Sequence, residues 1–313
     1  MATRPNIIVR IRKKIPDIIG KNPVLYFLLG LIVVGIVFLV LKQHETLQKK
    51  DVLGTVFGFL LDILLFGVLL SLYEEWRERR ERIRRYHDEL SDFLAWQGEE
   101  GLLRKAGIIR RLNDMKAGFP SLNSIVLNKA DLRGVDLRGA NLYAADLREV
   151  NLQGANLRGA TLTLANLRGA NLWEANFQGA ILAYTDLQDT THLDTNFSGA
   201  ILQEAKLQGV IFLGVDFQGA NLQGANFQGT TLIEADFSGA NLSGANLKGA
   251  DLRGSDLQGA NLTEANLQGA NFNGAYMFKT KNLTWMQLEQ AILDEKTILP
   301  DYLKQSDPKK QSG

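Results

Sequence analysis

The strongest constraint on the fold is a five-residue period that runs from Pro120 to Lys279 without a change of phase. It comprises thirty-two quintets such as ADLRG and ANLQG, and thirty-one of their central residues are Leu, Phe or Met. From the third quintet on, a small residue, mostly Ala, stands two positions before each centre, and Asp or Asn usually stands one position before it. A strict short period over so long a stretch predicts a solenoid, in which each unit packs only against its neighbours.

These A(D/N)LxX quintets resemble the repeat of the pentapeptide-repeat family, and the resemblance covers about half of the chain. It implies an all-β, right-handed quadrilateral β-helix with four quintets in each square coil, and therefore about eight coils. A local check on the twenty-residue coil comes from four of the seven Phe centres, which lie twenty residues apart and would stack in one interior column: Phe177, Phe197, Phe217 and Phe237.

The segments outside the solenoid are expected to anchor it and to close its ends, since solenoids need capped termini. Around the β-helix at 120–279, the sequence predicts a basic cytoplasmic N-terminus (1–23), two transmembrane helices (24–41 and 52–73), charged juxtamembrane helices with an N-terminal cap (74–119), a helical C-terminal cap (280–304) and a disordered tail (305–313). A capping box at Thr284 and Gln287 predicts that the C-terminal helix starts there, and the pattern continues it through Leu293.

Two apolar runs, 24–41 and 52–73, are each long enough to cross a membrane, because about 20 apolar residues span the hydrocarbon layer. A buried helix pair in a soluble core is the alternative. Six basic residues precede the first run and six Arg follow the second, whereas only three Lys lie between them. The positive-inside rule then predicts a two-helix hairpin with both ends in the cytoplasm, and basic flanks that contact membrane lipid.

The second run contains a candidate contact between helices. Gly54, Gly58 and Asp62 recur every four residues and therefore share one helical face. Small residues at this spacing let helix backbones approach closely, and a carboxyl within a membrane usually faces protein. The face is expected to pair the two spans or two protomers. A proton or ion relay at Asp62 is the other interpretation.

Composition limits the chemistry that the chain can perform. There is no Cys, which excludes disulfides and thiolate sites, and the three His are far apart in the sequence. No nucleophile–base pair, phosphate-binding loop or metal-ligand spacing is present. The near-neutral total of 35 basic and 34 acidic residues argues against nucleic-acid binding. The sequence therefore predicts a protein that is not an enzyme and that has no cofactor and no metal.

Two departures from the repeat single out one face of the predicted solenoid. Its outward position after the centre is apolar in four successive coils, and this candidate interaction stripe consists of Trp173, Leu193, Leu213 and Ile233. The stripe is expected either to bind a partner or to be covered within the chain. His192 is the one polar centre, and we interpret it as a hydrogen-bonded packing variant or a local bulge, with a ligand or pH response as the alternative.

These patterns favour a membrane-anchored scaffold that presents a rigid β-helix in the cytoplasm to a protein partner or to a second copy of itself. By resemblance, anchored proteins of this type are similar to those of cyanobacteria, so the membrane would be a plasma or thylakoid membrane. Two alternatives remain at this point. One is DNA mimicry directed at gyrase, which the family includes, although residues 120–279 carry only fifteen acidic against ten basic residues. The other is a membrane transport role that uses Asp62.

Overall fold

The computed structural model describes residues 49–94, 96 and 98–305, together with Gly30, Ile32 and Gly35. The chain divides into two compact units, residues 1–84 and 85–313, which are treated separately. The predicted first span, 24–41, lies almost entirely outside the described residues, as do the N-terminal segment 1–23 and the tail from 306. The elements, in order, are α3 (Lys49–Phe93), α4 (Glu99–Asp114), β1 (Ile211–Leu213), β2 (Thr231–Ile233), α5 (Trp285–Leu288) and α6 (Asp301–Gln305).

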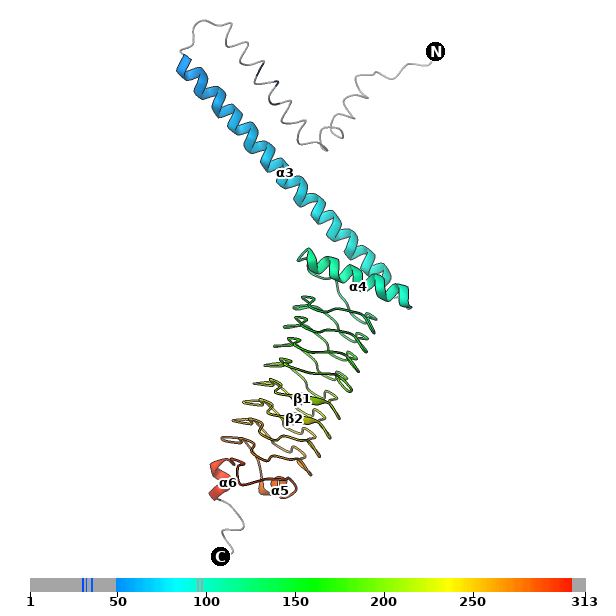
Figure 1. Cartoon of the computed structure of the whole chain (residues 1–313), viewed down its shortest axis with the longest axis vertical. Coiled ribbons are helices and arrows are strands. Elements are labelled where there is room, and N and C mark those ends of the chain that lie inside the picture. Colours follow the sequence, from blue (N-terminus) through cyan, green and yellow to red (C-terminus); the bar gives the residue numbers. More distant parts are fainter. Residues whose placement is uncertain are drawn as a thin grey trace, which may run out of the picture. The chain divides into compact units, whose positions relative to one another are not determined.

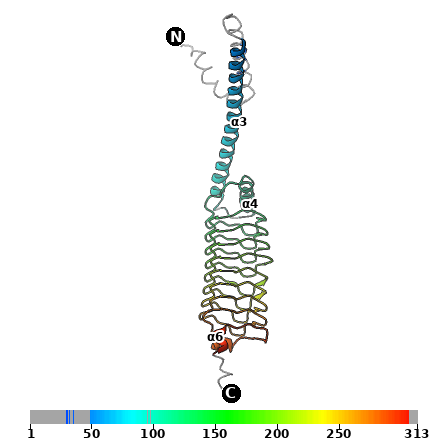
Figure 2. The ribbon, with the colours of Figure 1, turned by 90° about the vertical axis from the view of Figure 1, so that its left-hand side faces the viewer.

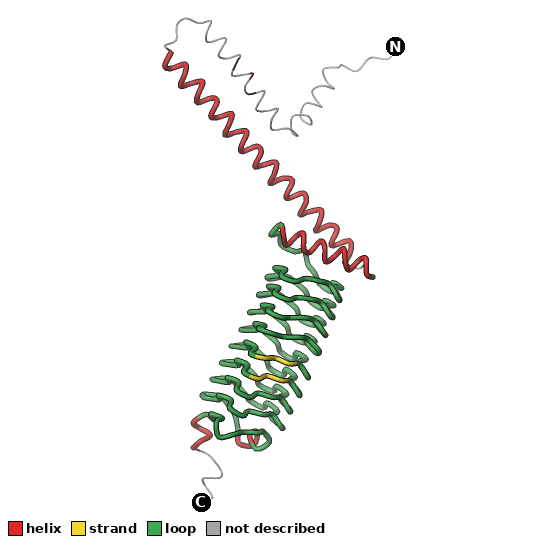
Figure 3. The backbone as a smooth tube through the Cα atoms, in the orientation of Figure 1, coloured by secondary structure: helices red, strands yellow, loops and turns green. Residues whose placement is uncertain are grey.

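The repeat forms a stack of coils (Figures 1 and 3). From Val126 to Asn261, parallel bridges join each residue before a centre to the residue twenty positions later, as in Asp131 to Asn151 and Asn226 to Asn246, so each coil contains twenty residues. The expected four quintets per coil are confirmed. We number the four faces by the first centre on each: face 1 from Leu122, face 2 from Leu127, face 3 from Leu132 and face 4 from Leu137. Figure 2 shows the same stack from the side.

The recurring Asp or Asn is explained by the backbone hydrogen bonds of a quintet, and residues 226–230 show all of them. Three N–H groups donate to neighbouring coils: Asn226 to Ala205, Phe227 to Asn246 and Gly229 to Lys248, at 2.8–2.9 Å. The fourth closes a turn from Thr230 to the carbonyl of Phe227, and the fifth, that of Gln228, donates to the Asn226 side chain at 3.1 Å. The side chain thus accepts the one N–H that the ladder cannot satisfy.

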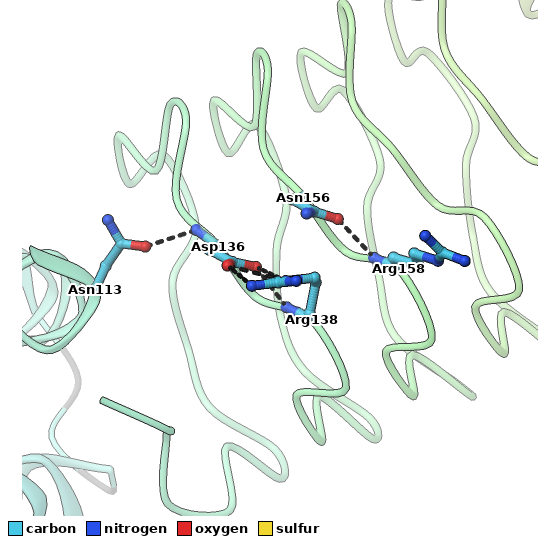
Figure 4. A network of polar contacts seen from close by, with 5 residues as sticks. All are labelled: Asn113, Asp136, Arg138, Asn156 and Arg158. Carbon is cyan, nitrogen blue, oxygen red and sulfur yellow. Dashed lines mark hydrogen bonds and ion pairs between the residues drawn. The ribbon is translucent and has the colours of Figure 1, made fainter. Parts of the chain in front are cut away.

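The same side-chain bond is visible at Asp136 and Asn156 in Figure 4, where each accepts from the backbone N–H two residues later, at 3.3 and 3.2 Å. Arg138 also folds back and donates its guanidinium N–H groups to Asp136. This side-chain hydrogen bond lowers the pKa of the Asp136 carboxyl. Much of the acidic charge near the start of the solenoid is neutralised in this way, since Asp131 and Asp146 pair with Arg133 and Arg148.

Large and small side chains fill the interior together. The predicted Phe column on face 4 is confirmed, because successive rings from Phe177 to Phe237 stack at 5.0–5.3 Å with interplanar angles of 10–15°. All four rings are fully buried. The residue two positions after each centre has positive φ, for example 64° at Gly219 and 57° at Glu234, which explains why Gly occupies so many of these corners.

Helix α4 covers the first coil, where no preceding coil offers hydrogen-bond acceptors. Its Asn113 side chain accepts from the backbone N–H of Asp136 at 2.8 Å, in place of a carbonyl from a coil below (Figure 4). Arg110 forms an ion pair with Asp131 at 2.7 Å. The apolar face of α4 is buried, and Lys105 is buried with it. The Nζ of Lys105 donates to the Trp96 carbonyl at 3.0 Å, and burial lowers the pKa of this amine. Helix α4 therefore supplies a hydrogen-bond acceptor to the first coil and also covers its apolar interior.

The C-terminal end differs from the expected helix through Leu293. The capping box is present, but α5 is a single turn that ends at Leu288. The chain then returns to the solenoid: Ile292 bridges Asn271 and Ile298 bridges Tyr276. These spacings are twenty-one and twenty-two residues, so the chain runs first one and then two residues out of phase, which conceals a further partial coil that the strict period misses. The solenoid thus continues past residue 279, and the cap contains only the short helices α5 and α6.

In the N-terminal unit, α3 carries the apolar run that was predicted as the second span. Among the described residues, one helix is long and apolar enough to cross a membrane, with a mean hydropathy of 2.3 in its most apolar window and none of that window buried. Continuity of this helix through residue 93 agrees with the absence of Gly and Pro between Tyr73 and Gly98. The last turns of α3 belong to the C-terminal unit, where Leu90 is fully buried and Tyr86 lies beneath Arg111 of α4.

Candidate functional site

The candidate interaction stripe lies on face 3, where its four side chains are one coil apart. Three of them are exposed, with 43% of Trp173, 41% of Leu193 and 49% of Leu213 accessible, and Ile233 is half-buried. Ile211 is 60% exposed beside Leu213 and extends the apolar surface. The expectation that the stripe could be covered within the chain is not met by any described segment. These residues form an apolar surface on an ordered scaffold.

The local backbone explains why this part of face 3 is flat. Thr191, Ile211 and Thr231 replace the usual Asp or Asn, so the turn-forming side-chain acceptor is missing from the face-3 quintets of three successive coils. Two of these quintets contain the only regular strands among the described residues, β1 and β2, which pair in parallel with Leu213 opposite Ile233. In β1 the burial alternates, with Ile211 and Leu213 outward and Phe212 inward. An extended segment therefore presents two apolar side chains where a normal quintet presents a polar turn.

A second apolar surface was missed by the sequence analysis. It lies on and beside face 1, ten residues and therefore half a coil from face 3, and its exposed members are Tyr143, Leu164, Ile181, Tyr184 and Ile201. The loss of Asp and Asn that marks the stripe also occurs here, at Thr161, Ile181 and Ile201. That criterion, applied to every face, would have found both surfaces.

His192 occupies the centre of face 3 directly behind the stripe, and its side chain points into the core. Its ring packs against Phe212 at 4.1 Å between centroids and against Phe197 at 5.9 Å. Nε2 lies 2.7 Å from Oγ1 of Thr190 and Nδ1 lies 3.3 Å from Oγ1 of Thr195, so each ring nitrogen has a hydroxyl partner. Burial lowers the pKa of His192 to about 3. The packing-variant interpretation describes this geometry well.

Gly54, Gly58 and Asp62 lie on one exposed side of α3, so the predicted shared face is present. Among the described residues, nothing occupies the space that a Cβ would fill at Gly54 or Gly58. Close approach occurs elsewhere on the helix: a Cβ built on Gly30 would lie 2.8 Å from Cγ2 of Ile63. Whether the three residues contact a partner helix stays a prediction.

A scan against family models matched the pentapeptide repeats in eight copies over six ranges: 125–163, 162–191, 181–219, 193–229, 220–259 and 255–294. Together these ranges span residues 125–294, which is more than half of the 313-residue chain. The chain belongs to the pentapeptide-repeat family. Its members form right-handed quadrilateral β-helices, which agrees with the four faces and twenty-residue coils of this solenoid.

Among solved structures, HetL is similar to this chain at 30% sequence identity, covering 62% of this chain and 92% of HetL with a TM-score of 0.39. HetL is a pentapeptide repeat protein involved in heterocyst differentiation regulation in the cyanobacterium Nostoc sp. strain PCC 7120. QnrB1, a plasmid-mediated fluoroquinolone resistance protein, is similar at 19% identity, covering 61% of this chain and 97% of QnrB1 with a TM-score of 0.52. The likeness to QnrB1 concerns the fold alone. A search of curated proteins found no match.

Proposed function

We propose that this pentapeptide-repeat protein is a membrane-anchored scaffold that assembles or regulates a membrane complex. A two-span hairpin holds the β-helix at the cytoplasmic side of a bacterial plasma or thylakoid membrane, as in anchored cyanobacterial proteins of this type. The stripe on face 3 binds a protein partner, and the chain performs no catalytic step. The observation that carries this proposal is the exposed apolar surface on face 3 of the solenoid, because surfaces of this kind commonly mark contacts.

The anchor part of the proposal is supported by α3 and by its close approach to Gly30. A helix of this hydropathy with an unburied apolar window suits a lipid environment. The Gly30–Ile63 approach supports pairing of the two spans, since a small residue lets helices pack closely. The face of Gly54, Gly58 and Asp62 is then available to contact a second protomer, and self-association of the protein would occur through this face. Basic residues flanking the spans contact anionic lipid.

The topology can be tested directly because the chain lacks Cys. Single Cys variants at Gln48, between the spans, and at Gln218, on the solenoid, are expected to react with an impermeant maleimide from opposite sides of the membrane. The Gln48 variant should label in intact spheroplasts, and the Gln218 variant only after permeabilisation. Labelling of both positions in intact spheroplasts would contradict the hairpin. Lysed samples of both variants are labelled in parallel, to show that each Cys reacts once the maleimide can reach it.

The interaction surface is tested by Leu213→Glu in the full-length chain. A carboxylate in the stripe is expected to weaken any complex that buries it by at least tenfold, because the charge would lose its water. The matched control is Gln223→Glu, which adds the same charge at the equivalent exposed position of face 1. Native complex size and in-cell crosslinking yield are compared for the two variants. An unchanged complex in Leu213→Glu would refute the scaffold surface.

DNA mimicry directed at gyrase remains the second candidate, favoured by the fold shared with QnrB1 and by the Asp residues of face 4. Asp216, Asp236 and Asp256 lie one coil apart on that face, and the residues that follow their centres are Gln and Ser. The basic N-terminal coils argue against it, since their Arg side chains neutralise the neighbouring carboxylates. A gyrase supercoiling assay with the full-length chain decides between the two, because a scaffold of the proposed kind leaves supercoiling unchanged.

A further inference from the structure

The apolar stripe has a charged border on one side only. The corner between face 3 and face 4 carries Glu174, Asp194 and Glu234, each directly after a stripe residue. All three are exposed, and none forms an ion pair within the described part of the chain. Each holds a side chain at positive φ, between 53° and 57°, at a corner position that is Gly in many other quintets. The stripe thus runs beside a column of unneutralised carboxylates.

One cation of the solenoid lies next to this border: Arg253 occupies the stripe column one coil after Ile233, and its guanidinium pairs with Asp251 at 2.7 Å. Between Arg168 and Arg253 the only basic residues are Lys206 and Lys248, and both belong to face 2, on the opposite side of the stripe from the acidic corner. Face 4, beyond the corner, adds Asp216 and Asp236, which accept hydrogen bonds from backbone N–H groups and not from cations. The potential along this edge is therefore negative, and a partner that covers the stripe must supply positive charge there.

Spacing defines the shape of the partner. Stripe residues recur once per coil, at about the 4.8 Å distance between neighbouring strands. An α-helix lying along the solenoid axis presents one turn every 5.4 Å, so apolar side chains at i, i+4 and i+7 meet successive coils with a small cumulative offset. An added β-strand is disfavoured, because β1 and β2 already pair with each other and the carbonyls of Thr191 and Leu193 already accept from the preceding coil. A helix fits the stripe better than an extended peptide does.

Charge also argues against two other occupants. An anionic lipid surface would be repelled by the acidic column. A second copy of this chain, placed stripe to stripe, would bring two such columns together. We propose that the stripe on face 3 binds an amphipathic helix of a partner protein, with Lys or Arg on the side that faces Glu174, Asp194 and Glu234. This inference rests on the proposed scaffold function and specifies the chemistry of its partner.

The test uses the full-length chain in nanodiscs of zwitterionic lipid and a defined probe, an eighteen-residue helical peptide of Leu and Lys with a diazirine on its apolar face. A second peptide with Glu in place of every Lys is the probe control. We expect the Lys peptide to bind at least tenfold more tightly than the Glu peptide. Its photocrosslinks are expected to map to residues 171–234 and not to α3.

Two charge-reversal variants locate the effect. Glu174→Lys/Glu234→Lys is expected to weaken binding of the Lys peptide at least tenfold and to strengthen binding of the Glu peptide. Glu204→Lys/Glu264→Lys makes the same charge change at corners of face 1 with the same backbone conformation, and is expected to change either affinity less than twofold. Circular dichroism of each variant establishes that the β-helix is intact.

Equal affinity for the two peptides, crosslinks confined to α3 or to lipid, or crosslinks between copies of the chain would each overturn the inference. None of these results by itself removes the scaffold function, because that function is judged by the Leu213→Glu variant. If Leu213→Glu disrupts the native complex while the two peptides bind equally, the stripe is an interface of another chemistry. If Leu213→Glu has no effect either, both proposals fail.

Discussion

Replacing Phe217 by Ala is expected to lower the free energy of unfolding by about 3–5 kcal/mol, which is the range for removing a fully buried aromatic side chain. Phe217 is 0% exposed and stacks on Phe197 at 5.3 Å and on Phe237 at 5.2 Å. Phe212 and Phe227 meet its ring edge-on. The closed coils cannot collapse around the cavity, because each is held to its neighbours by the backbone ladder on four sides.

The measurement is urea unfolding of the full-length chain in detergent, followed by the β-sheet signal in circular dichroism. Phe217→Leu is the matched control, since Leu257 already occupies the same column two coils later. We expect the Leu variant to lose less than half as much stability as the Ala variant. If Phe217→Ala loses no more unfolding free energy than Phe217→Leu does, the Phe stack adds nothing beyond its apolar volume.

The solenoid was predictable because each quintet repeats the same pattern of residue types. The large centre, the small residue before it and the corner residue recur in phase, so a sequence period translates directly into a stack. The four sides were implied by the resemblance to the pentapeptide-repeat family, and the twenty-residue spacing of the Phe centres agreed with it, since a four-sided coil brings Phe177 above Phe197. The capping box at Thr284 was likewise local, and it is present with both of its hydrogen bonds.

The features that could not be predicted from the sequence depend on contacts between residues that are far apart in the chain. The role of Asp and Asn became evident only with the ladder in place, because the N–H they accept is the one that neighbouring coils leave unpaired. The last partial coil was hidden by insertions that shift Ile292 and Ile298 out of phase. At the candidate site, the stripe could be found from four apolar residues in phase, and its counterpart on face 1 could have been found from the missing Asp and Asn at Thr161, Ile181 and Ile201. Strands β1 and β2 required knowing where the backbone becomes extended.

Acidification is expected to destabilise the solenoid through His192. Burial against Phe197 and Phe212 lowers the pKa of His192 to about 3, whereas an imidazole in the unfolded chain titrates near 6.5. As pH falls below about 6.5, the unfolded state takes up a proton that the folded state does not bind, so folding stability decreases. Between pH 7 and pH 4.5 the expected loss is about 2–3 kcal/mol. The contribution of the neutral His192 side chain to folding stability is fully present only above about pH 6.5.

His192→Leu isolates this effect, because it restores the centre found in most quintets and leaves no hydroxyl without an acceptor. Thr190 donates to the Leu187 carbonyl and Thr195 to the Leu172 carbonyl in the presence of the imidazole, and both bonds can persist without it. The paired carboxylates of Asp136 and Asp146 have lowered pKa values, so their contributions are lost only at more acidic pH. Urea midpoints measured from pH 7 to pH 4.5 should therefore fall in the native chain and stay nearly level in His192→Leu. Parallel curves for the two proteins would show that His192 does not set the acid sensitivity of the fold.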